Sequence, residues 1–134
     1  MRYLLILTAI TAFLPSAFAQ DAKVARGKYL VEEVARCPDC HTPKMQDGKF
    51  IKSQWMKGAT LDFTPATPVP GWRSKSPDVT ALSPLWKRWG DEGFAKFLQT
   101  GKGPRGNTPG APMPSYNLTA EDADAVVAFL KTIQ

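Results

Sequence analysis

Hydrophobic and small residues recur at helical spacing in three separate parts of the chain. The first stripe lies between residues 22 and 36 and consists of Val24, Gly27, Leu30, Val31 and Val34. This spacing predicts an amphipathic helix with one buried face, which ends before Pro38. A glycine inside a helix costs about 1 kcal/mol relative to alanine. Its place on the buried stripe therefore predicts a close contact between this helix and another.

The other two predicted helices are marked by their ends as well as by their stripes. Ser83 is a good N-cap for the second helix, with Pro84 in its first turn, and Gly101 supplies a left-handed stop. The third helix runs from its N-cap Thr119 to about Ile133. Acidic residues occupy its first turn, where the helix dipole favours them. Both segments carry apolar residues on one face.

The segments between the predicted helices are rich in proline and glycine. Residues 59–84 contain five prolines, and residues 101–114 contain four prolines and four glycines. No run of alternating residues predicts a strand. Loops of this length in a compact domain usually have a function or wrap around something. We therefore expect an all-α domain of three or more short helices, with long loops around a large central body.

A secretory signal peptide is predicted at residues 1–19. Arg2 gives a positive start, residues 4–14 form an apolar run, and the sequence AFA at 17–19 is a small-x-small cleavage site. The run is shorter than the roughly 20 apolar residues that a membrane-spanning helix needs. We therefore expect a single mature domain of residues 20–134, which lies outside the cytoplasm and does not span a membrane.

Charge limits the class of partner. The chain carries 17 basic and 12 acidic side chains, a net charge of +5 that falls to +4 when Arg2 is removed with the leader. The basic residues are spread along the chain, whereas a nucleic-acid binder more often concentrates them in a stripe. We expect no nucleic acid partner. A protein partner with an acidic docking surface fits better, because opposite charge raises the rate of encounter.

Both cysteines and the only histidine lie in the sequence CPDCHT at residues 37–42. A thioredoxin-like dithiol requires a βαβ context, and a structural zinc site requires four ligands; a small disulfide loop is a third alternative. Cys-x-x-Cys-His is also the attachment sequence for a c-type haem. The thiols of Cys37 and Cys40 would add to the haem vinyl groups, and His41 would bind the iron. The predicted export agrees with haem attachment, and a haem would be the large central body that the loops are expected to surround. We therefore predict one covalent haem c.

The chain resembles class I c-type cytochromes of bacterial type over essentially all of residues 20–134. The stretch RGKYLVEEVARCPDCHTP resembles the family's first helix and haem motif. WGDEGFAKFLQTGKGPRG resembles a middle helix common in small cytochromes and cytochrome subunits that serve periplasmic dehydrogenases. APMPSYNLTAEDADAVVAFLKTI resembles the methionine loop and the terminal helix. The resemblance implies the cytochrome c fold, with the first and last helices crossed at Gly27, and is weaker over residues 50–76.

Met113 is the predicted second axial ligand. The chain has one histidine, so three methionines of the mature domain are the candidates. Met45 is too close to His41 in sequence to reach the opposite face of a porphyrin, and Met56 is expected to fill space in the core. Met113 lies between two prolines in a stiff loop before the last helix. The family resemblance indicates the same residue.

Other residues are expected to support the haem. The carbonyl of Pro43 is predicted to accept a hydrogen bond from Nδ1 of His41 and so orient the ring. Arg73 and Lys75 are candidates to neutralise the haem propionates. The tryptophans that are candidates to pack against the haem are Trp55, Trp72, Trp86 and Trp89.

The predicted function is that of a periplasmic one-electron carrier. An iron with His41 and Met113 as its two axial ligands has no open position for a substrate, so we expect no enzyme activity. One alternative is a cytochrome subunit bound tightly to a periplasmic dehydrogenase. Another is an open-site haem sensor or peroxidase, which requires that Met113 does not bind the iron.

Overall fold

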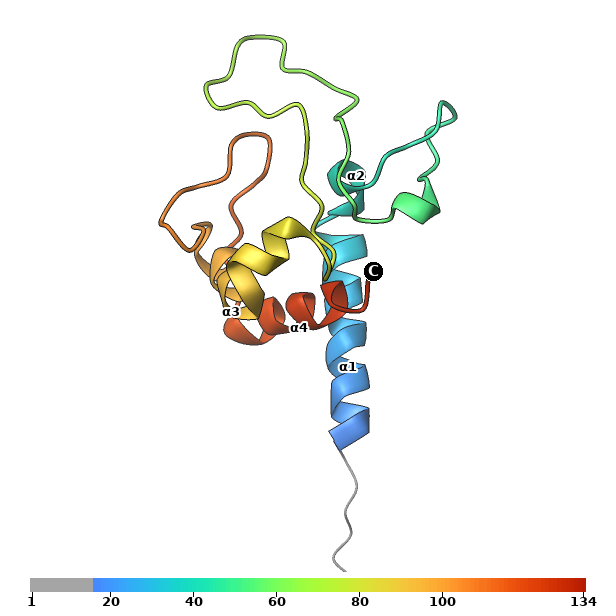
Figure 1. Cartoon of the computed structure of the whole chain (residues 1–134), viewed down its shortest axis with the longest axis vertical. Helices are drawn as coiled ribbons and strands as arrows, with labels where there is room; N and C mark the ends of the chain where they lie inside the picture. Colours follow the sequence, from blue (N-terminus) through green and yellow to red (C-terminus); the bar gives the residue numbers. More distant parts are fainter. Residues whose placement is uncertain (1–15) are drawn as a thin grey trace, which may run out of the picture.

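The computed structural model describes residues 16–134, and within them the secondary structure is helical (Figure 1). Over this range there are two isolated β-bridges and no strand. The elements in chain order are α1 (Ser16–Tyr29), the π-helical turn η1 (Leu30–Val34), α2 (Pro38–His41), the 3-10 turn η2 (Lys52–Gln54), α3 (Pro84–Thr100) and α4 (Ala120–Leu130). The all-α prediction is confirmed.

The predicted ends of α3 and α4 are confirmed by their hydrogen bonds. Ser83 Oγ accepts from the backbone N–H of Trp86 at 3.0 Å, and Thr119 Oγ1 accepts from that of Asp122 at 3.2 Å. Each bond satisfies one of the free donors at a helix N-terminus. At the other end of α3, Gly101 has a φ of 68°, the left-handed conformation that stops the helix.

Helices α1 and α4 cross in direct backbone contact, as predicted from the place of Gly27 on the buried stripe. Gly27 is buried, and a Cβ atom added to it would lie 1.9 Å from the carbonyl oxygen of Ala125 and 2.9 Å from Cβ of Phe129. In Figure 1, α4 runs across α1 near the middle of the molecule. Arg26 flanks the crossing and donates two hydrogen bonds to the carboxylate of Asp122, at 2.9 and 3.1 Å.

The first helix departs from its predicted stripe at Val34. The N–H of Ala35 donates to the carbonyl of Leu30 at 2.8 Å, five residues back, which makes the last turn a π-helix. This wider turn rotates the following residues relative to an α-helix. Leu30 and Val31 are buried as predicted, but Val34 is 56% exposed. The prediction that Val34 belongs to the buried stripe was wrong.

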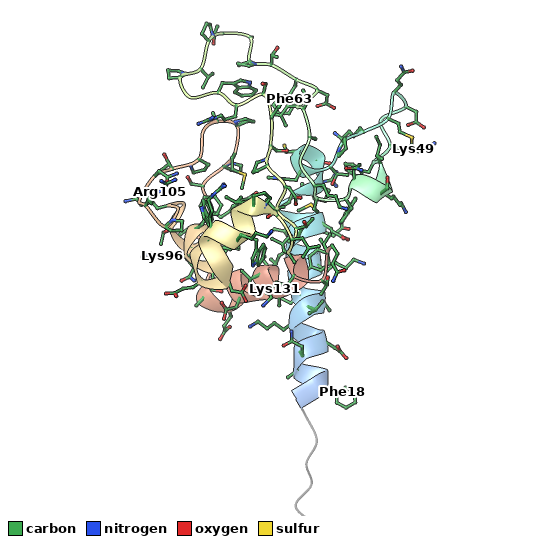
Figure 2. The ribbon with its side chains drawn as sticks, in the orientation of Figure 1. Phe18, Lys49, Phe63, Lys96, Arg105 and Lys131 are labelled. Atoms are coloured by element: carbon green, nitrogen blue, oxygen red, sulfur yellow. The ribbon has the colours of Figure 1, made fainter. Side chains whose placement is uncertain are left out.

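Two long loops extend to the same side of the helices (Figure 1). The first loop comprises residues 59–76 and is held as a narrow hairpin by the Leu61 N–H, which donates to the Ser74 carbonyl at 2.9 Å. The second loop comprises residues 101–118 and connects α3 to α4. Figure 2 shows Phe63 on the first loop and Arg105 on the second. Residues of both loops line one cavity together with residues of the helices.

The predicted signal peptide lies almost wholly outside the described residues. Its cleavage after residue 19, and the resulting domain of residues 20–134, therefore stay predictions. Over residues 16–134, no helix has both the length and the apolar character that a membrane span requires.

Candidate haem site

A cavity of about 710 Å³ opens between the helical core and the two loops. Its wall on the helical side is apolar and comes from α3 and α4: Leu85, Trp89, Phe94, Phe97, Leu98, Val126 and Leu130. Residues with chemical function also line it, among them Cys37, Cys40, His41, Met56, Met113 and Tyr116. The sequence-predicted attachment and ligand residues are thus brought together around one space.

The short helix α2 places the two cysteines and the histidine at the cavity. Its hydrogen bonds run from His41 N–H to Cys37 O at 2.9 Å and from Thr42 N–H to Pro38 O at 3.0 Å. One helical turn sets Cys37 and Cys40 on the same side, because residues three apart are neighbours on a helix. The two are not joined in a disulfide. Burial raises the pKa of the Cys37 thiol to about 11.

His41 is buried and held in one tautomer. Its Nδ1 lies 2.8 Å from the carbonyl oxygen of Pro77. A carbonyl only accepts, so Nδ1 carries the proton and Nε2 keeps the free lone pair that can bind a metal. Burial is the main cause that lowers the pKa of His41, which favours the neutral ring. The Gly58 N–H also donates to the His41 carbonyl, at 2.8 Å.

The predicted role of Pro43 was wrong. The chain becomes extended at Thr42, directly after α2, and carries Pro43 away from the histidine ring. The Pro43 carbonyl accepts instead from the N–H of Ile51, at 2.9 Å. The carbonyl that orients His41 belongs to Pro77, 36 residues further along the chain.

Ser76 is a supporting residue that the sequence did not reveal. Its hydroxyl donates to the carbonyl of Cys40 at 2.6 Å and accepts from the N–H of Ala59 at 2.9 Å. Gly58 packs against the same segment, since a Cβ there would lie 2.6 Å from the Ser76 carbonyl oxygen. The residues around Pro77 therefore form a brace behind α2. No local pattern identifies these contacts, because they join residues 17 to 36 positions apart.

Two methionines line the cavity, from different segments. Met56 is 1% exposed, and its N–H donates to Oγ1 of Thr42 at 3.0 Å, beside the histidine. Because Met56 also lines the cavity, its expected core-filling role stays a prediction. Met113 comes from the second loop and is half-buried. Tyr116 anchors the end of that loop, since its hydroxyl donates to the Ala35 carbonyl at 3.4 Å.

One edge of the cavity is basic. Arg73 and Lys75 both contribute to its lining. Next to Arg73, the indole N–H of Trp72 is buried and has no hydrogen-bond partner among the described residues. Of the four candidate tryptophans, Trp89 lines the cavity, while the indole N–H of Trp86 donates to Asp91 at 3.0 Å in the helical core.

These features fit a haem. The apolar wall suits a flat macrocycle, and the two thiols lie where its vinyl groups would be attached. A neutral imidazole and a thioether supply the two axial donor types found in cytochromes c. The basic edge at Arg73 and Lys75 suits negatively charged carboxylates.

Comparison with known proteins agrees with this fit. The profile of the Cytochrome c family matches residues 24–134. The chain therefore belongs to the cytochrome c family. Membership carries with it a covalently bound haem c.

Among curated proteins, the chain is similar to larger cytochromes. It is 32% identical over 113 residues to a diheme cytochrome c-type protein of Cereibacter sphaeroides, covering 81% of this chain and 34% of that protein. It is 27% identical over 135 residues to the gluconate 2-dehydrogenase cytochrome c subunit of Pantoea cypripedii, covering 92% and 29%. The fructose dehydrogenase cytochrome subunit of Gluconobacter japonicus is 28% identical over 114 residues, covering 81% and 21%. The chain spans about a third or less of the length of these relatives.

Proposed function

We propose that the chain is a periplasmic one-electron carrier with a single haem c. In this proposal Cys37 and Cys40 attach the haem, and His41 and Met113 are the axial ligands. The observation that carries the proposal is that all four side chains line one cavity. The single Cys-x-x-Cys-His sequence supports one haem, and the leader pattern at residues 1–19 supports export to the periplasm.

Each residue has a distinct task in electron transfer. When bound, the haem supplies an iron that takes up and releases one electron. The Pro77 carbonyl keeps the proton of His41 on Nδ1, which leaves Nε2 free to bind the iron that the haem would supply. The thioether of Met113, as a ligand, would raise the reduction potential of the haem iron relative to other ligand sets. The apolar residues of α3 and α4 exclude water, which also tunes the potential.

The electron partner is proposed to be a protein with an acidic docking surface, and a dehydrogenase is the candidate donor. The net positive charge of the chain supports the first part. The second is supported by the relatives named as cytochrome subunits of gluconate 2-dehydrogenase and fructose dehydrogenase. The same names favour a second candidate function, in which this chain stays bound to a dehydrogenase as its electron-accepting subunit.

The ligand assignment is tested by the weak near-red absorption of a sulfur-to-iron bond in the ferric protein. The wild type should show this band and should resist carbon monoxide in the ferrous state. Met113→Ala should lose the band, lower the reduction potential and bind carbon monoxide readily. Met56→Ala is the matched control and should keep the band. A wild type that lacks the band and binds carbon monoxide at once would support an open-site haem instead.

A further inference from the structure

The two long loops touch each other beside the residue that we propose as the iron ligand. The backbone N–H of Arg73 in the first loop donates to the carbonyl of Ala111 in the second loop, at 2.6 Å. At the neighbouring residue Gly110, an added Cβ atom would lie 2.3 Å from the carbonyl oxygen of Gly71 and 2.8 Å from Cγ of Arg73. The backbones of the two loops are therefore in contact with no room for a side chain between them.

The contact between the two loops lies at the turn that precedes Met113. The N–H of Met113 donates to the carbonyl of Gly110 at 3.2 Å, so Gly110 and Ala111 are the first two residues of a four-residue turn that ends at the methionine. The chain after Met113 is held separately, by Tyr116 on Ala35 and by hydrogen bonding to the end of α3. The first loop is thus the support for the N-terminal side of the Met113 turn.

The glycine at position 110 is explained by space and not by backbone conformation. Gly106, in the same loop, has a φ of 77° and nothing within 4 Å of an added Cβ, so its glycine serves a left-handed turn. Gly110 has no such φ, but its Cβ would clash with a backbone oxygen. A backbone atom cannot move aside as a flexible side chain can, so the two loops would have to separate.

We propose that Gly110, together with the backbone of residues 71–73, is a positioning element that keeps Met113 on the iron. This inference rests on the proposed ligand role of Met113. A thioether is a weak ligand, so its bond depends on how much conformational freedom the loop loses when it binds. The first loop limits that freedom in advance. This adds a second role to the proline-rich segment 59–76, whose Ser76 also braces α2.

The test compares Gly110→Ala with Gly106→Ala in the full holoprotein, with covalent haem content measured first. Gly110→Ala should weaken or abolish the near-red band, lower the reduction potential and raise the affinity for cyanide about tenfold or more, since overpacking at a closed contact is destabilising. Gly106→Ala should keep the band and the potential of the wild type. A Gly110→Ala protein that keeps both would overturn the positioning role.

A second measurement uses the wild type alone and does not depend on the folding of a variant. Cyanide that displaces Met113 should speed hydrogen exchange at the Arg73 amide, because binding equilibria of coupled sites are reciprocal. The Leu61 amide, bonded within the first loop, should be unaffected. Unchanged exchange at Arg73 would contradict the coupling. A wild type with no near-red band overturns the ligand assignment and the positioning role together, whereas an unresponsive Arg73 amide overturns the positioning role alone.

Discussion

Gly27 and Ala125 bring the backbones of α1 and α4 into contact, with the Ala125 carbonyl oxygen 1.9 Å from where a Gly27 Cβ would lie. The crossing joins the two ends of the domain and supports the apolar wall of the haem cavity. α4 contributes Val126 and Leu130 to that wall, directly after the crossing point. The geometry of the haem pocket therefore depends on a glycine that does not line it.

Gly27→Ala should destabilise the protein by about 2 kcal/mol or more, because the methyl group forces two helix backbones apart. The measurement is urea unfolding of the haem-loaded protein, followed by far-ultraviolet circular dichroism. Gly48→Ala is the control, since its Cβ would meet nothing within 4 Å. Alanine is disfavoured at the left-handed φ of 80° of this residue, so Gly48→Ala should lower the free energy of unfolding by about 1 kcal/mol. Equal losses in the two variants would contradict the account of the crossing.

The haem of the mature protein should remain attached through denaturation and acid–acetone extraction, since two thioether bonds hold it. A Cys37→Ala, Cys40→Ala double variant should release any haem that it binds. Each single variant should retain its haem through one bond. Mass spectrometry of the denatured chains measures all four proteins. Haem that extracts freely from the wild type would rule out covalent attachment at these cysteines.

Electron transfer with the natural partner should slow as ionic strength rises towards physiological values, where the screening length is about 8 Å. The exposed basic side chains are spread over the surface, as Lys49, Lys96 and Arg105 show in Figure 2. Stopped-flow mixing at several salt concentrations measures the effect, and a neutral small reductant provides the control. A rate with the partner that does not vary with salt would favour the permanently bound subunit.

Asp91 should contribute to stability at neutral pH and lose that contribution in acid. Its carboxylate accepts from Lys131 of the chain end and from the indole of Trp86, and the pKa of Asp91 lies below its ordinary value of 3.8, chiefly through Lys131. Because the folded-state pKa is lowered, the contribution is complete above 3.8 and disappears as pH falls through the folded value. The pair is largely exposed, so Asp91→Asn should cost at most about 1 kcal/mol at neutral pH.

Unfolding of Asp91→Asn and of the wild type should be compared at several pH values. The difference in free energy of unfolding should shrink below pH 3.8. Glu92→Gln, at the next position of α3, is the control for the loss of one negative charge. A difference that persists unchanged into acid would assign the effect to packing of the amide rather than to the ion pair.

Features encoded by neighbouring residues could be predicted from the sequence. The caps Ser83 and Thr119 and the stop at Gly101 are formed by groups within a few residues of each other, and all three occur in the structure. The π-helical turn that exposes Val34 could not be predicted, because α and π turns share the same apolar pattern over five residues.

The haem attachment residues could be predicted from the sequence, but the contacts that orient them could not. Cys37, Cys40 and His41 are adjacent in the chain, so spacing alone indicates their chemistry. The carbonyl that orients His41 is a backbone group, which any residue carries, and it reaches the ring only through the fold of the first loop. Predicting Pro43 for this role followed sequence proximity, whereas Pro77 is brought there by the brace at Ser76.

The lining of the cavity extends along the chain from Ala35 to Leu130, so the pocket is complete only once α4 has packed against the rest of the domain. A chain exported with its N-terminus first presents Cys37 before α4 exists. In the closed domain, burial raises the Cys37 thiol pKa to about 11, so little of the reactive thiolate forms at neutral pH. Thioether formation should therefore precede closure, and a chain truncated before Ala120 should still gain covalent haem while staying sensitive to protease. In that order, α4 would close over a haem that is already attached.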